Sequence, residues 1–520
     1  MSALSQQNNK RIAKNTLLLY FRMLFSMGIG LFTSRIVLES LGIEDYGIYN
    51  LVGGIVTIFA FLNSAMIATS QRFISYELGK GNLHKLKDVF CTTLTIHIAI
   101  AFIIVVLSEV IGVWFLNTKL NIPSDRMMAA NWTLQLSIFV FAVNVISVPY
   151  NASIVAHEKM SAFAYISIFE VSLKLAIAYL LLFISYDKLI VYSILVFCVA
   201  LLLRSLYCFY CKRHFEECHY TFSFNIEQFR EMFAFAGWSL VGNLGFSFKD
   251  QLSNILLNLF FGTVVNAARG ISVQVGSLIN SFSANFMMAM NPQITSYAVG
   301  DLYRSKELVY AGCRFSFYLL AVISLPIMIN ITYILNSWLV EVPQYTDIFL
   351  ILTIVCNLLY AISSPLTTAM QATGRIKWFQ VIICIVMLTE LPIAYLLLSI
   401  GYPPYSVLYA SLFVTLLGVL IRIVLISRIL PIYEIRYYVT HIFSKNILIV
   451  FITYCIAYIL HKKMEQDSFF TAVLSSFILE LILFSLAYLC GLSSTERYVV
   501  NQKLVTILES KRRKNKQKNI

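Results

Sequence analysis

Long apolar segments alternate with short polar connections along the whole chain. A helix needs about 20 mostly apolar residues to cross the hydrocarbon core of a membrane, and about fourteen segments reach that length. The pattern predicts an all-α integral membrane protein. The predicted spans lie near residues 13–38, 46–71, 88–115, 127–149, 161–184, 190–210, 233–261, 264–290, 314–338, 346–369, 378–400, 405–427, 441–460 and 468–490.

Composition agrees with lipid as the surrounding medium. The 520 residues are 59% hydrophobic and 12% charged, whereas a soluble domain carries about 25% charged residues. The net charge of +13 would suggest nucleic-acid binding in a soluble protein. Here the basic residues fall between the spans, so we expect no nucleic-acid partner.

Lys and Arg are concentrated on one side of the predicted spans. By the positive-inside rule this side is cytoplasmic, and an even number of spans places both termini there. A basic tail ends the chain on the same side: Lys511, Arg512, Arg513, Lys514, Lys516 and Lys518.

Enzyme signatures are missing from the sequence. No outer connection is predicted to exceed roughly a dozen residues, too few for a folded domain. There is no GxxxxGK[ST] loop and no pair of aspartates two apart that would hold a metal–nucleotide complex. We therefore expect a protein that is not an enzyme, with no catalytic residues and no cofactor.

One connection is rich in potential metal ligands, namely Cys208, Cys211, His214, Cys218 and His219. Only one Cys-x₂-Cys arm is present, whereas zinc sites of this type use two ligand pairs. We interpret the segment as a helix end followed by an amphipathic linker and predict no metal site.

The chain contains an internal repeat. Segments that match in residue type and spacing are 66–79 with 287–300, 149–159 with 365–375, and Arg204 with Arg422. We interpret them as duplication of a six-helix unit, whose two lobes share one orientation and are related by a pseudo-two-fold axis along the membrane normal. The expected parts are an N-terminal lobe (1–210), a cytoplasmic linker (211–232), a C-terminal lobe (233–427), two additional spans (428–490) and a basic cytoplasmic tail (491–520).

Ionisable residues inside a membrane need a partner, a cavity or an escape to the surface. Arg204 and Arg422 lie near the inner helix ends, where we expect them to reach water by snorkelling. Arg22 lies roughly 15 Å deep with no acidic residue within a turn, so it should face a cavity. Glu170 and Lys174 have the spacing of a helical ion pair.

Cations outnumber acids in the expected interior, where the seventh and eighth spans are rich in polar residues. Arg and Lys bind phosphate strongly in a partly hydrated cleft. The pattern therefore favours an anionic substrate.

Three segments carry a resemblance to a known family: LGIEDYGIYNLVGGIV (41–56), FGTVVNAARGISVQV (261–275) and MNPQITSYAVGD (290–301). They resemble the Wzx-like polysaccharide biosynthesis flippases of the MOP (multidrug/oligosaccharidyl-lipid/polysaccharide) exporter superfamily. The resemblance implies the two-lobed, V-shaped fold of MATE exporters and lipid II flippases. It also implies transport of an undecaprenyl-diphosphate-linked oligosaccharide across the bacterial cytoplasmic (inner) membrane, for O-antigen, capsule or exopolysaccharide synthesis.

The resemblance suggests roles for individual residues. We expect the diphosphate to be held by Arg22, Lys249 and Arg269, and the sugars to be contacted by Asn63, Asn243, Gln274 and Asn285. Candidates for ion coupling are Asp250, Glu170 and Lys174. The expected partners are the anionic lipid-linked substrate, membrane lipids, and a polysaccharide polymerase or glycosyltransferases.

Two alternatives stay open. A cation-coupled multidrug exporter of the MATE type would use Asp250, the one acid comparable to those of such exporters. A membrane scaffold of a glycan-assembly complex would dock its partners through the basic tail.

Overall fold

The chain is helical throughout the part that the computed structural model describes, which comprises residues 3–157, 159–221, 226–373, 377–462, 469–494, 496–498 and 501–502. None of these residues lies in a β-strand. The predicted all-α fold is confirmed. The basic cluster from Lys511 to Lys518 lies outside the described residues.

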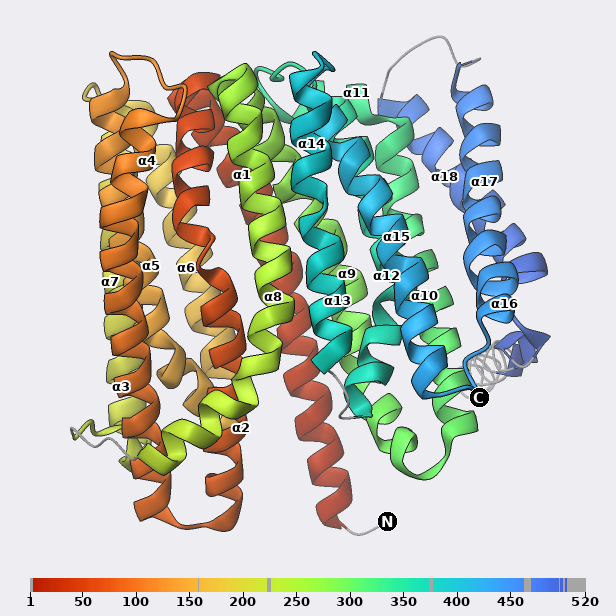
Figure 1. The fold of residues 1–520 in the computed structure, drawn as a ribbon, viewed down its shortest axis with the longest axis horizontal. Helices are drawn as coiled ribbons and strands as arrows, with labels where there is room; N and C mark the ends of the chain where they lie inside the picture. Colours follow the sequence, from red (N-terminus) through yellow and green to blue (C-terminus); the bar gives the residue numbers. More distant parts are fainter. Residues whose placement is uncertain are drawn as a thin grey trace, which may run out of the picture. The chain divides into compact units, whose positions relative to one another are not determined.

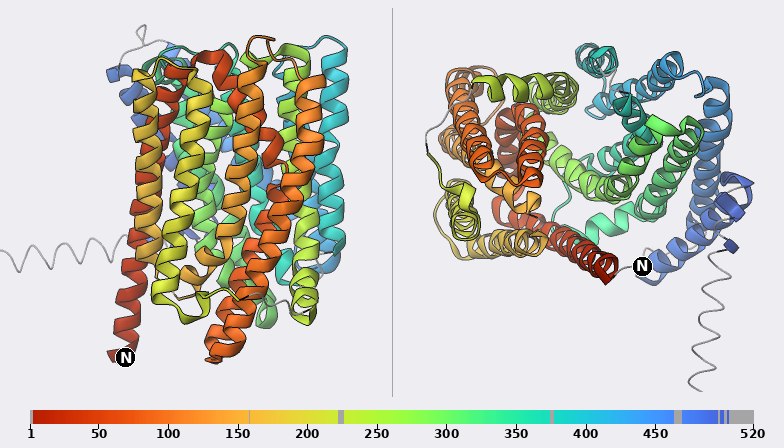
Figure 2. Two further views of the ribbon diagram at one scale, coloured as in Figure 1. Left: turned by 90° about the vertical axis from the view of Figure 1, so that its left-hand side faces the viewer. Right: turned by 90° about the horizontal axis from the view of Figure 1, so that it is seen from below.

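The long helices within each compact part lie side by side along a common direction (Figures 1 and 2). Their bounds are α1 (Ala3–Thr57), α2 (Ala60–Lys80), α3 (Leu83–Leu107), α4 (Val113–Thr118), α5 (Met127–Ala156), α6 (Met160–Leu180), α7 (Lys188–His214), α8 (Ile226–Phe261), α9 (Thr263–Gly300), α10 (Leu302–Ile329), α11 (Ile331–Trp338), α12 (Thr346–Ala372), α13 (Lys377–Leu388), α14 (Glu390–Ser399), α15 (Ser406–Ile429), α16 (Ile435–Tyr437), α17 (Lys445–Lys462) and α18 (Phe469–Leu486).

Eleven helical stretches of the described residues are long and apolar enough to cross a membrane. Helices α2, α8 and α9 are not among them, although they are 21, 36 and 38 residues long. Asn, Gln, Ser and charged residues interrupt the apolar sequence of α8 and α9. The total of fourteen spans therefore stays a prediction.

The first two helices differ from the predicted spans 13–38 and 46–71. Helix α1 continues to Thr57 through a kink at Gly42, where the backbone has φ 79° and ψ 169°. Helix α2 starts only at Ala60, and no side chain caps its N-terminus. The two residues at this break, Ile58 and Phe59, are apolar and carry no turn signal, which explains why the hydrophobic pattern did not reveal it.

The described chain divides into two compact units. Unit 1 comprises residues 1–275, 338–350 and 380–414, and unit 2 comprises 276–337, 351–379 and 415–520. Helix α8 belongs to unit 1 and packs against α2 and α1. The units thus divide the chain differently from the lobes expected at 1–210 and 233–427, which stay a prediction.

Glycines let α1 approach α8 and α9 closely within unit 1. A Cβ atom on Gly47 would overlap the backbone carbonyl of Thr263, and one on Gly54 would lie 2.6 Å from the Gln251 side chain. We call this close contact of α1 with α8 and α9 the α1 seam. The same helix α1 also packs against α4 and α5 in the core of unit 1, where Leu51 is fully buried. The seam positions the polar residues of α8 and α9 beside α1.

A cluster of three charged residues joins α1, α5 and α7 in unit 1. The Arg126 guanidinium donates to Asp45 Oδ1 at 2.7 Å and to Asp187 Oδ2 at 2.8 Å. Asp187 also caps α7 by accepting from the backbone N–H of Leu189. Burial alone would raise the pKa of Asp187, but its hydrogen bonds to Arg126 and the helix N-terminus outweigh burial and lower that pKa.

Candidate functional site

Three adjoining cavities in unit 1 share Tyr49 of α1 in their walls. We name them by a distinguishing residue: the Ser193 cavity (about 180 Å³), the Arg269 cavity (about 290 Å³) and the Lys174 cavity (about 370 Å³). The Arg269 cavity shares Gly53 and Thr57 with the first and Asn50 with the third. Together they form the candidate site, along the second half of α1.

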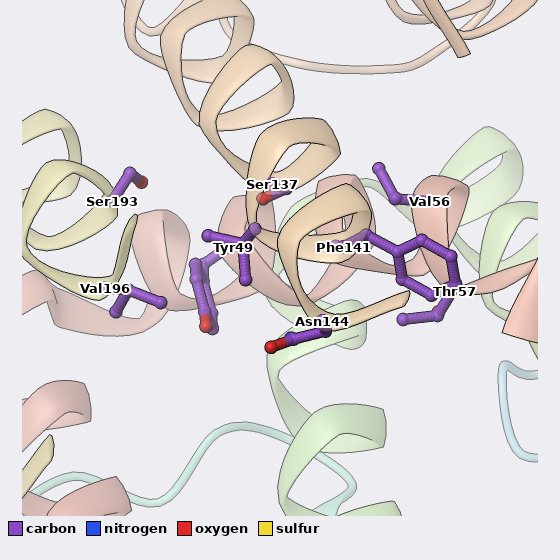
Figure 3. A pocket seen from close by; sticks show the side chains of 10 residues that line it. Tyr49, Val56, Thr57, Ser137, Phe141, Asn144, Ser193 and Val196 are labelled. Atoms are coloured by element: carbon purple, nitrogen blue, oxygen red, sulfur yellow. The ribbon is translucent and has the colours of Figure 1, made fainter. Parts of the chain in front are cut away.

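The Ser193 cavity lies between α1, α5 and α7 and is shown in Figure 3. Its walls offer the hydroxyls of Thr57, Ser137 and Ser193 and the amide of Asn144, beside apolar side chains such as Phe141. Carboxylates and cationic side chains do not line it. Such a neutral polar wall suits hydroxyl groups or water.

The Arg269 cavity contains an ion pair between α8 and α9. Arg269 Nη2 lies 3.6 Å from Asp250 Oδ1, which is longer than a good hydrogen bond. The Arg269 side chain is 7% exposed, whereas that of Asp250 is 54% exposed. The guanidinium is thus nearly desolvated, and its acidic partner can turn to water.

The Lys174 cavity extends the site towards α6. Gln274 is fixed in its wall, because its Nε2 donates to Gly30 O at 3.2 Å and its Oε1 accepts from Tyr46 at 3.4 Å. Lys174 forms an ion pair with Glu170 at 2.6 Å. The helical ion pair predicted from their spacing is confirmed, and Lys174 lines this cavity while Glu170 is held beside it.

Arg22 does not line the three cavities. Its Nη1 lies 3.4 Å from Ser167 Oγ, and its guanidinium stacks 4.9 Å from the centre of the Phe163 ring, both on α6. The buried Nε of Arg22 has no hydrogen-bond partner. This cation therefore keeps donor capacity, but the cavity that we expected it to face is none of these three, so that expectation stays a prediction.

Lys249 is also absent from the cavity walls and lies instead in a buried polar cluster. Its Nζ is 3.1 Å from Glu390 Oε2 on α14 and donates to Ser411 Oγ on α15 at 2.9 Å. Ser253 donates to the second Glu390 oxygen at 3.0 Å, and Glu390 is 1% exposed. The pairing neutralises Lys249, so we leave it out of the phosphate site proposed below.

The remaining predicted sugar contacts do not line the three cavities. Asn63 lies half-buried in α2, and its Oδ1 is buried without a hydrogen-bond partner. Asn243 is half-buried in α8. Asn285 belongs to unit 2 and donates to Ser281 O within α9. Their sugar-binding role stays a prediction.

The cysteine-rich connection does not assemble a metal site among the described residues, where no three His, Cys, Asp or Glu side chains converge. Cys211 donates weakly to the Tyr150 carbonyl, and His214 bonds the Tyr210 carbonyl through Nδ1. His157 pairs with Glu217 at 2.6 Å. These contacts attach the linker after α7 to the end of α5.

Sequence reasoning missed two features of the site. Glu390 was recognisable only as an isolated acid, because its partner Lys249 lies on a helix distant in sequence. Tyr49 and Asn50 lie within the LGIEDYGIYNLVGGIV segment. The sequence identified this segment as part of the family resemblance but did not indicate that it lines a cavity. Their wall position depends on the α1 seam, which the sequence pattern does not reveal.

Comparison with known protein families gives a match over more than half of the chain. Residues 12–298 match the family described as polysaccharide biosynthesis protein. The uncharacterized membrane protein EpsK of Bacillus subtilis (strain 168) is 19% identical over 304 residues. That match covers 57% of this chain and 59% of EpsK, so the chain spans less than two thirds of this relative.

Solved structures share the fold. The lipid II flippase MurJ in an inward closed conformation superposes with a TM-score of 0.68 at 14% identity, covering 91% of this chain and 99% of MurJ. The MATE multidrug transporter DinF-BH gives a TM-score of 0.60 at 15% identity, covering 81% of this chain and 95% of the transporter. At these identities the likeness establishes the fold.

Proposed function

This chain belongs to the polysaccharide biosynthesis protein family, and on that premise we propose that it is a flippase for an undecaprenyl-diphosphate-linked oligosaccharide. It would act in the bacterial cytoplasmic membrane, with both termini in the cytoplasm, and supply O-antigen, capsule or exopolysaccharide synthesis. Its fold is that of a flippase and a drug transporter, neither of which is an enzyme.

The observation that carries the proposal is the ion pair of Arg269 and Asp250. A desolvated guanidinium offers two parallel N–H donors that match phosphate oxygens. Its present bond to Asp250 is long, so an incoming diphosphate can replace the carboxylate. Asp250 then turns to water, as its exposure already permits.

Cavity size indicates which part of the substrate is held. The three cavities measure about 180 to 370 Å³, whereas pockets that enclose a drug-sized ligand measure about 300 to 1,000 Å³. Only the Lys174 cavity reaches that range, at its lower end, so we propose that the cavities hold the diphosphate and single sugars rather than the whole lipid-linked oligosaccharide. In this proposal Gln274 and Asn50 contact sugar hydroxyls beside the diphosphate.

Arg22 is a second candidate cation for the substrate, although it lies outside the three cavities and contacts α6. Its weak bond to Ser167 leaves little to break. Glu170 and Lys174 neutralise each other at the cavity rim. They can separate when an anion approaches Lys174, which makes the pair a second candidate for coupling.

Ion coupling follows from the same exchange at Arg269. Once the diphosphate replaces Asp250, this carboxylate no longer has a cation 3.6 Å away and becomes available to a coupling cation. Binding of the substrate and of the coupling ion is then linked, because the substrate binds Arg269 and the ion binds Asp250, the two members of one ion pair.

A second candidate function is a cation-coupled multidrug exporter. It is favoured by the 54% exposure of Asp250 beside the cavity, since an accessible carboxylate attracts cationic drugs. In that case Arg269 would only position Asp250.

Reconstitution in proteoliposomes separates the two functions. We expect the wild-type protein to translocate a lipid-diphosphate oligosaccharide and not a cationic dye. Empty vesicles give the background rate for each compound. Dye transport without oligosaccharide translocation would establish the exporter and refute the flippase.

A further inference from the structure

Arg422 of α15 is a buried cation without an acidic partner among the described residues. Its side chain is 1% exposed, so it does not reach water by snorkelling as its position near a helix end suggested. Its Nη1 donates to Ser363 Oγ at 3.3 Å, and its guanidinium lies 5.3 Å from the centre of the Tyr360 ring, both on α12. The Nε–H group is buried without a hydrogen-bond partner.

Tyrosines surround this guanidinium within unit 2. Tyr438 is fully buried, interacts electrostatically with Arg422 and donates to Ile362 O. Tyr310 packs against Tyr438 with ring centroids 6.3 Å apart, and its buried hydroxyl has no hydrogen-bond partner. One aromatic cluster thus contains two hydrogen-bond donors without partners, the Nε–H of Arg422 and the hydroxyl of Tyr310.

The aromatic cluster extends to the surface through Tyr437, beside a second cation. Tyr437 stacks on Tyr310 and is 36% exposed. Lys306 Nζ lies 5.7 Å from the centre of the Tyr310 ring and 3.6 Å from Glu434, a surface carboxylate. Lys306 thus adds a second positive charge at the exposed edge of the cluster.

Unit 1 has a half-buried arginine at the matching position of the sequence repeat. Arg204 of α7 interacts electrostatically with Tyr150 of α5, and its Nη1 is buried without a hydrogen-bond partner. Within the described residues, neither Arg204 nor Arg422 forms an ion pair with a carboxylate. The two arginines occupy matching positions of the sequence repeat, on α7 against α5 and on α15 against α12.

A buried cation needs an anion, because protein dipoles alone do not replace its lost hydration. Basic pockets between transmembrane helices commonly bind phosphate headgroups of anionic lipids. Phosphate oxygens accept from guanidinium and phenol donors alike. We propose that Arg422 and its tyrosine cluster bind the phosphate of an anionic membrane phospholipid, and that Arg204 binds a second one in unit 1.

Lipid titration of the purified, delipidated full-length protein tests this site. The readout is the melting temperature against increasing phosphatidylglycerol, with phosphatidylcholine and inorganic phosphate as separate arms. We expect phosphatidylglycerol to raise the melting temperature most. Arg422→Gln should weaken its apparent affinity by about tenfold or more, because a charge-assisted hydrogen bond is lost, whereas the exposed Arg428→Gln on the same helix should leave it unchanged.

Further outcomes decide the proposal independently of transport activity. If Arg422→Gln does not fold, Arg422→Lys and Arg204→Gln replace it, and each should weaken phosphatidylglycerol binding relative to Arg428→Gln. Equal stabilisation by phosphatidylcholine, or equal affinity in the Arg422 and Arg428 variants, would overturn the proposal. Full stabilisation by inorganic phosphate alone would overturn the lipid assignment.

Discussion

Two adjacent residues of α8 take part in two ion pairs that differ in burial. Lys249 pairs with Glu390, which is 1% exposed, and serines complete its surroundings. Asp250 pairs loosely with Arg269 beside a cavity. A buried pair resists separation, whereas a half-exposed pair separates easily. We therefore propose a structural role for the first pair and substrate exchange for the second.

Loss of one partner of the buried pair should destabilise the protein strongly. We expect Lys249→Met to lower the free energy of unfolding by about 3 to 5 kcal/mol, because it leaves the Glu390 charge without compensation. Thermal unfolding in detergent measures the effect. Lys174→Met is the control, since the more exposed pair with Glu170 contributes about 0 to 1 kcal/mol. Equal melting temperatures for the two variants would contradict the assignment.

The two lysine pairs also show what the sequence alone could predict. Glu170 and Lys174 are one helical turn apart, so their spacing identified the pair. Lys249 and Glu390 lie on helices far apart in the chain, and only tertiary packing brings them together. Arg422 was misjudged for a related reason, because the tyrosines that cover it come from α10, α12 and the segment after α15.

At the scale of elements, the seam between α1 and the α8–α9 hairpin shapes the site. We expect Gly47→Ala to destabilise unit 1 by about 1 to 3 kcal/mol, because the added Cβ collides with the Thr263 backbone, which cannot move aside as a side chain would. Gly28→Ala on the same helix is the control, since its Cβ meets no atom within 4 Å. Thermal melts that do not separate the two variants would refute the close approach.

The cluster of Arg126, Asp45 and Asp187 should make stability depend on pH. The folded-state pKa of Asp187 is lowered, so its contribution is fully present above the unfolded value of about 3.9 and is lost as the pH falls through the lower folded value. Asp187→Asn keeps a helix-capping oxygen but removes the charge. We expect wild type to melt higher than this variant at neutral pH, and we expect the difference to shrink as the pH falls below about 4 and to disappear below the lowered folded-state pKa. A constant difference would contradict the ion pair.

Element boundaries were predictable where polar residues mark them. The break between α1 and α2 lies at Ile58 and Phe59, whose apolar side chains carry no turn signal, so the second predicted span began and ended too early. The polar character of α8 and α9 was predictable from composition, and both contribute walls to the candidate site.

At the scale of the whole molecule, the hydrophobic pattern and the sequence resemblance led to the same family that the comparison identifies. The all-α fold is confirmed, whereas the lobes and the total of fourteen spans stay predictions. Mapping which loops lie on each side of the membrane would test them, because the positive-inside argument depends on recognising every span. A shared fold does not determine which substrate is transported, so the substrate has to be identified from the side chains at the site.

The most direct test of the central claim is oligosaccharide translocation in proteoliposomes that carry Arg269→Gln. Our account predicts that this variant lowers the rate by about tenfold or more, because the diphosphate loses a charge-assisted partner. Arg230→Gln, which changes an exposed arginine of the same unit, should retain the wild-type rate. Translocation by Arg269→Gln at the wild-type rate would contradict the account.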